Sequence, residues 1–158
     1  MFKGGLAMQL QITELKDTEI SGVRVVNFED APLISENYFE WYPFTMDTQF
    51  KSSAIMGGVL AGWHHTVNYT KCEIHDDAEV FYFNDGDCIM FFIDVEDGEP
   101  LMDTAQLVRI PEGTVLEMAA GKGHYVPVAE GDYYQALVFS PRQDAIKFPL
   151  AEEVTGVF

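Results

Sequence analysis

The sequence predicts a single all-β domain, residues 1–158, built as a barrel or jelly roll, and three observations support this. Short segments that alternate apolar and polar residues recur along the chain, about eight to ten of them, separated by turn residues. No long run repeats apolar residues with the period of an amphipathic helix. Strands do not alternate with helices, which disfavours a parallel sheet. A chain of 158 residues can bury one sizeable core.

The predicted strands fall into three regions. Residues 8–28 hold two N-terminal strands, which we expect to pair as a hairpin or at a sheet edge. Residues 54–140 form the barrel core, in which Asp85-Gly86 is typical of a hairpin turn and predicts that the flanking strands are antiparallel neighbours. Residues 141–158 form a tail, which we expect to wrap the outside of the barrel or a partner subunit.

Residues 29–53 are the least regular region. Ser35 is suited to cap a short helical turn, and this is the one helix that the sequence suggests. A group of aromatic side chains in the same region fits either a plug or lid packed over the core or a wall facing a substrate. The group consists of Tyr38, Phe39, Trp41, Tyr42 and Phe44.

The composition is that of a folded, acidic protein. Nine Lys and Arg stand against 26 Asp and Glu, for a net charge of −17, so nucleic acids and anionic membranes are disfavoured as partners. The apolar stretches are too short for a spanning helix, and the opening residues carry no secretory signal. Cys72 and Cys88 lack the C-x-x-C spacing and fit reduced thiols, which predicts a cytoplasmic protein.

One short segment concentrates ionisable side chains. Glu73 and His75 are two residues apart, so on a strand both point to the same face. Glu79 can join them if the chain bends at Asp76-Asp77. Two carboxylates and an imidazole would then converge, an arrangement suited to metal binding or to acid–base chemistry.

The spacing of this segment resembles the first motif of the cupin superfamily. His75, Glu79 and Gly86 occupy the positions of the motif's second histidine, glutamate and closing glycine. Glu73 replaces the first histidine, and Val67 stands at the position of the leading glycine.

A second segment resembles the second cupin motif. It keeps Gly113, Gly121 and His124 at the spacing of that motif. Ala119 replaces the proline, and Val128 replaces the final asparagine. The two matches occur in the expected order, and in finer detail they are similar to the ureidoglycolate-lyase-like branch and related uncharacterised bacterial cupins.

The resemblance implies a double-stranded β-helix, the cupin or jelly-roll barrel, with a divalent metal held by Glu73, His75, Glu79 and His124. A site with two carboxylates and two imidazoles favours Mn, Fe, Zn or Ni over copper(I). A metal-free pocket is the alternative, in which close carboxylates would form a proton donor and acceptor pair.

These residues predict a lyase or isomerase that acts on a small hydroxy acid, ureide or sugar, with Glu73, Glu79 and His75 as catalytic residues. The alternatives are a metabolite-binding cupin without catalysis and a structural or storage cupin with an unused pocket. We also expect a homodimer, because the N-terminal strands and the tail are suited to cover sheet edges.

Other reactive residues receive different interpretations. On a strand, only one of His64 and His65 can face the interior, and a packing role is favoured over a ligand role. Lys122 is expected to be a solvated turn residue. Cys72 neighbours Glu73 and should point away from the site.

Overall fold

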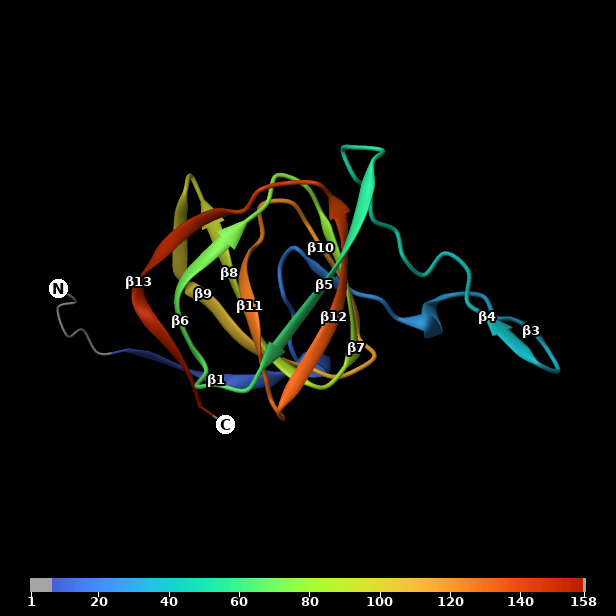
Figure 1. Cartoon of the computed structure of the whole chain (residues 1–158), viewed down its shortest axis with the longest axis horizontal. Helices are drawn as coiled ribbons and strands as arrows, with labels where there is room; N and C mark the ends of the chain where they lie inside the picture. Colours follow the sequence, from blue (N-terminus) through green and yellow to red (C-terminus); the bar gives the residue numbers. More distant parts are fainter. Residues whose placement is uncertain (1–6, 158) are drawn as a thin grey trace.

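The computed structural model describes residues 7–157, which are mostly β-strand (Figure 1). The prediction about the opening residues 1–6 lies outside the described residues. The strands are β1 (Met8–Glu14), β2 (Val23–Val25), β3 (Ile34–Glu36), β4 (Phe39–Trp41), β5 (Ile55–Trp63), β6 (Asn68–Ile74), β7 (Glu79–Asp85), β8 (Cys88–Glu96), β9 (Glu99–Ile110), β10 (Val115–Met118), β11 (Gly123–Ala129), β12 (Tyr133–Pro141) and β13 (Ile146–Val157). Two short 3₁₀-helices occur in this range, η1 (Leu15–Asp17) and η2 (Phe28–Asp30). None of the described helices is long and apolar enough to cross a membrane.

Two sheets make up the body of the molecule. Six strands close into a barrel in the order β1-β13-β6-β11-β8-β9, and five strands form a second sheet in the order β2-β10-β7-β12-β5. The chain passes repeatedly from one sheet to the other, as in a jelly roll. The predicted all-β jelly-roll barrel is confirmed.

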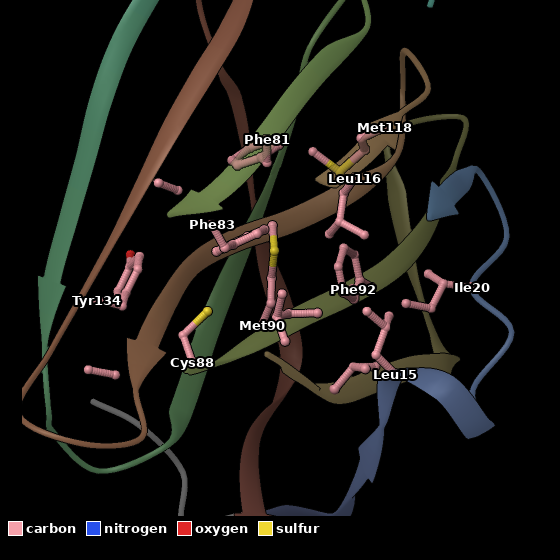
Figure 2. Packing of buried hydrophobic residues seen from close by; sticks show 14 residues of the cluster. Leu15, Ile20, Phe81, Phe83, Cys88, Met90, Phe92, Leu116, Met118 and Tyr134 are labelled. Atoms are coloured by element: carbon pink, nitrogen blue, oxygen red, sulfur yellow. The ribbon is translucent and has the colours of Figure 1, made fainter. Parts of the chain in front are cut away.

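The core has two parts because the barrel strands are apolar on both faces. In β8, Ile89 and Phe91 point into the six-stranded barrel. Met90 and Phe92 point the other way, into a cluster that includes residues of both sheets and therefore lies between them. Figure 2 shows this second cluster, where Phe83 of the five-stranded sheet approaches these β8 side chains. A continuous apolar run is what a strand buried on both faces requires.

The two ends of the chain contribute barrel strands rather than peripheral ones. β1 pairs in parallel with β13 and then with β9, which closes the barrel, while β2 pairs with β10 in the other sheet. The predicted N-terminal hairpin of residues 8–28 is therefore wrong. The tail after residue 141 does not wrap the outside of the barrel. It forms β13, a strand of the barrel itself that pairs antiparallel with β6.

Asp85-Gly86 is a corner between sheets and not a hairpin turn. β7 belongs to the five-stranded sheet, whereas β8 belongs to the barrel, so the expected pairing of these strands is wrong. Gly86 has φ +73°, and a Cβ atom there would lie 2.3 Å from the backbone oxygen of Tyr133. Glycine is thus required because two backbone segments cross closely here. The Asp-Gly pattern predicts a turn but does not predict this crossing.

The helical turn predicted at Ser35 is wrong, because this residue lies in a β-hairpin. β3 and β4 pair antiparallel as a separate two-stranded sheet, with Ser35 opposite Glu40. Figure 1 shows this hairpin standing clear of the barrel. Its aromatic rings are largely exposed, Tyr38 at 83% and Trp41 at 56%. They form neither a lid over the core nor a wall of the site.

Candidate active site

The four side chains predicted to form a site come together between the two sheets. Glu73 lies on β6, His75 follows the end of that strand, Glu79 begins β7 and His124 lies on β11. His124 stands directly opposite Glu73 in the antiparallel pair of β11 and β6. Directly opposed residues project to the same face, so the pairing of these strands brings the two motif segments together.

The predicted bend between His75 and Glu79 is present and is held by a buried carboxylate. Asp77 is 8% exposed. Its carboxylate accepts hydrogen bonds from the backbone amides of Lys51 and Ala78, and its own amide donates to the side chain of Gln143. Since these bonds fix both sides of the bend, Asp77 positions His75 and Glu79 without entering the site.

The cluster is compact. The Nε2 atoms of His75 and His124 each lie 3.4 Å from Oε2 of Glu79. Oε1 of Glu73 is 3.8 Å from Nε2 of His75 and 3.9 Å from Nε2 of His124. The ligand atoms of Glu73, His75 and His124 all lie within 4.8 Å of one another. The two imidazole rings are 5.2 Å apart between centroids.

The hydrogen bonds around the cluster leave its centre electron-rich. Nδ1 of His124 lies 2.9 Å from the backbone oxygen of Lys122, which can only accept, so Nδ1 carries the ring proton. Nε2, the other ring nitrogen of His124, then faces the Glu79 carboxylate. Oε2 of Glu79 is buried and has no hydrogen-bond partner among the described residues. A buried carboxylate oxygen in this position needs a proton or a metal ion between it and the ring nitrogen.

The pKa values reflect the same crowding. Burial alone would lower the pKa of His75, but its polar contact with Glu73 and the negative charges of Glu79 and Glu73 outweigh burial and raise it. Contact with the His75 ring lowers the pKa of Glu73 against the opposing effect of burial, and the charges of His124 and Lys147 lower it further. At the observed 3.8 Å the contact of Glu73 with His75 is a charge interaction rather than a hydrogen bond.

Two cavities meet at the cluster. An inner cavity of about 190 Å³ contains all four predicted residues and is otherwise lined mainly by apolar side chains such as Phe81. An outer cavity of about 230 Å³ shares His75 and Glu79 with it and extends past Gly57 and Gly58 to Arg142. The cluster therefore lies where the two cavities adjoin.

Other reactive residues lie elsewhere. His64 and His65 are both exposed, and their ring nitrogens contact the backbone oxygens of Ala129 and Thr66, so neither joins the site. Cys72 faces the interior of the six-stranded barrel, as predicted.

Lys122 is not a solvated turn residue. It is 6% exposed, and its Nζ lies 2.7 Å from Oδ1 of Asp94. A lysine stem can be buried when its ammonium group finds a carboxylate at the end of its reach. Its contribution to the site is the backbone oxygen that orients His124.

Arg142 is the one residue of interest that the sequence reasoning missed. Arg24 pairs with Glu117, and Arg109 pairs with Glu14 and Glu130. Among the described residues, Arg142 has no carboxylate partner, although the chain is strongly acidic. It follows β12, outside both motifs, so no sequence pattern points to it.

Comparisons with known proteins add little to this picture. No protein-family model matches the chain, and no curated protein matches it significantly in sequence. A distant structural likeness is found to RmlC from Streptococcus suis, solved in complex with dTDP-D-xylose, with a TM-score of 0.42 and 12% identity over 70% of this chain and 60% of that chain. The chain thus spans less than two thirds of that structure. The strand order and the site geometry define an all-β protein with a jelly-roll barrel and a two-histidine, two-carboxylate cluster.

Proposed function

We propose that the chain is a metal-assisted lyase or isomerase that acts on a small carboxylate-bearing metabolite, a hydroxy acid in preference to a ureide or sugar. One observation supports the metal most strongly. The buried Oε2 atom of Glu79 has no hydrogen-bond partner within residues 7–157 and faces the Nε2 atoms of His75 and His124 at equal distances of 3.4 Å. Burying such a group costs free energy unless it binds something.

The separations fit a shared divalent ion. Metal bonds to histidine nitrogen and carboxylate oxygen are about 2.0–2.2 Å long, which places neighbouring tetrahedral ligands roughly 3.4 Å apart. Each histidine Nε2 has this spacing from Oε2 of Glu79 before any adjustment. Glu73 lies slightly farther from both histidines. We therefore assign His75, His124 and Glu79 as the ligands that hold the ion.

The donor set limits the kind of metal. Two imidazoles and a carboxylate suit Mn, Fe, Zn or Ni, and no soft sulfur ligand is present among the cluster residues to favour copper(I). When bound, the ion would supply positive charge that stabilises negative charge developing on a substrate oxygen.

Glu73 is the residue we assign to proton transfer. Its lowered pKa keeps the carboxylate ionised near neutral pH, so it can accept a proton. It lies in the inner cavity beside the histidines but is not required to hold the ion. From this position it can remove a proton from a carbon next to a carbonyl. Returning the proton to another position gives an isomerase, and loss of a leaving group gives a lyase.

The cavities limit the substrate to a small molecule. The inner cavity of about 190 Å³ is below the roughly 300 Å³ at which drug-sized ligands begin to fit. Arg142, which lines the outer cavity, is suited to pair with a substrate carboxylate. A cation there offsets the repulsion that an acidic protein exerts on an anion.

Hydrogen–deuterium exchange tests the function directly. Hydroxy and keto acids that stabilise the metal-loaded protein in a thermal-shift screen would be incubated with it in D₂O and followed by NMR. We expect exchange at the carbon next to the carbonyl, reduced about 100-fold or more in Glu73→Gln. The control is Glu153→Gln, an exposed carboxylate that bonds only to Asn68, and it should behave as wild type.

Each result has a defined consequence. Exchange that requires both the metal and Glu73 supports the enzyme. Binding of a hydroxy acid without exchange or turnover would overturn catalysis and leave the metabolite-binding alternative. If no compound in a broad panel stabilises the protein, the pocket is unused.

A further inference from the structure

The hairpin of β3 and β4 is joined to no other described strand, and its flank contacts the rest of the chain where Tyr42 stacks on Phe28. Each strand has three residues, and the pair forms its own sheet with no hydrogen-bonded neighbour among the described strands. An isolated two-stranded hairpin is marginally stable in water. Figure 1 shows that it extends away from the body of the molecule. We call residues 33–44, which comprise this hairpin and its flanks, the arm.

The arm exposes a large apolar surface. Its exposed apolar side chains are Leu33, Ile34, Tyr38, Phe39, Trp41 and Phe44, the last at 94%. Since a large aromatic side chain presents about 150–250 Å² when fully exposed, these six expose on the order of 700 Å² together. A stable protein interface buries roughly 800 Å² on each partner. The arm alone offers most of that area.

A matching groove lies on the outer face of the five-stranded sheet. Its volume is about 670 Å³, and no charged side chain lines it. Val80 and Tyr82 of β7 contribute to it, whereas their neighbours Phe81 and Phe83 face the core. Ile55 of β5 and Phe139 of β12 complete its floor. Concave apolar surface of this size usually marks a binding site.

We propose that the groove receives the arm of a second copy of this chain, so that two copies exchange arms in a symmetric dimer. Phe28 and Met46 line the groove and flank the arm in sequence, so the groove begins at the arm's root. Because the arm points away from its own sheet, a two-fold axis near the root would place each arm over its partner's groove. One contact then covers both exposed surfaces.

The uncharged lining of the groove favours a second copy of this chain over a cationic partner. Each chain carries a net charge of −17, so two copies repel at long range. The uncharged groove lets the contact form by apolar burial, which offsets the repulsion. Salt should therefore tighten the dimer by screening the repulsion, whereas it would weaken binding of a cationic partner.

The contact differs from the one that the sequence suggested. The N-terminal strands and the tail were expected to cover sheet edges of a partner, but β1 and β13 pair with strands of their own barrel. The arm and the groove are two exposed apolar surfaces that this pairing leaves free.

Light scattering and sedimentation of the full chain test the proposal. Wild type at micromolar concentration should have twice the 17.8 kDa mass of the chain, and its dimer should tighten between low salt and 0.5 M NaCl. The double variant Tyr38→Ser with Trp41→Ser removes two arm rings and should weaken association by about 100-fold or more. Phe139→Glu places a charge in the groove and should do the same. Ile146→Glu, the same substitution at a residue of similar exposure on β13, should remain dimeric.

Mixing the two defective variants provides the sharpest readout. If each arm enters the partner's groove, a mixture of the arm variant and Phe139→Glu restores one intact contact and recovers dimers that neither variant forms alone. A monomeric wild type, a dimeric arm variant or a mixture that stays monomeric would each overturn the proposal. Circular dichroism of every variant confirms that the barrel is folded, since the altered side chains are exposed.

Discussion

Replacing Glu79 by methionine should stabilise the metal-free protein. Oε2 of Glu79 is buried without a hydrogen-bond partner, and an unsatisfied buried polar group costs about 1–3 kcal/mol. Methionine has a similar volume and no group to satisfy. In a chain of this size each kcal/mol shifts Tm by about 2–4 °C, so Tm should rise by roughly 2–12 °C.

The Tm values of wild type and Glu79→Met are compared in EDTA at about pH 8.5, because the protonation of His75 changes with pH. A raised histidine pKa adds stability below the ordinary value of about 6.5, and this contribution is lost as the pH rises through the raised pKa. In alkali the Glu79 carboxylate therefore has little protonated imidazole to pair with. The increase in Tm that we predict for Glu79→Met is therefore largest at this pH.

Glu117→Met is the matched control. Glu117 is as buried as Glu79, but its carboxylate pairs with Arg24 and accepts a hydrogen bond from the amide of Asp47. Because Arg24 is half exposed, solvent screens this pair, and removing the carboxylate should destabilise the protein by about 1–3 kcal/mol. If Glu79→Met lowers the Tm of the metal-free protein as Glu117→Met does, the Glu79 carboxylate stabilises the fold. That result would contradict our interpretation that it is a ligand-binding group.

Three further predictions concern metal binding and catalysis. Glu79→Met should lose the metal while Glu73→Gln retains it, measured by elemental analysis; equal loss in both would make Glu73 a ligand. Metal affinity should rise about tenfold per pH unit in acid and level off only above about pH 6.5, because His75 must lose its proton and its pKa is raised; a titration series without pH dependence would contradict this. Arg142→Gln should raise KM about 10-fold or more for a carboxylate substrate and leave the KM of its amide analogue unchanged; equal effects on both would exclude a charge contact.

The sequence predicted the site better than it predicted the strand pairing. Glu73, His75 and Glu79 converge because strand alternation and one bend are local properties that the residue spacing specifies. His124 joins them through the pairing of β11 with β6. That contact is not local, and only the resemblance to a two-motif family predicted it.

The failures have a common cause, which is that a local pattern does not specify its partner. Asp85-Gly86 carries a hairpin signal, yet the close passage of Tyr133 turns it into a corner between sheets. The tail reads as peripheral, but β13 is needed beside β1 and β6 to close the barrel. Lys122 was predicted to be a surface residue, because the sequence does not show that its partner Asp94, on a strand distant in sequence, lies beside it.

The central claim is that this cluster binds a divalent metal, and metal stoichiometry tests it most directly. Protein purified without a histidine tag would be loaded in turn with Mn, Fe, Zn and Ni, dialysed and measured by elemental analysis, beside a His75→Ala, His124→Ala double variant. We predict about one ion per chain for at least one metal, and loss of that ion in the variant. Less than about a tenth of an ion per wild-type chain with every metal, or equal metal in the variant, would contradict the assignment of the site.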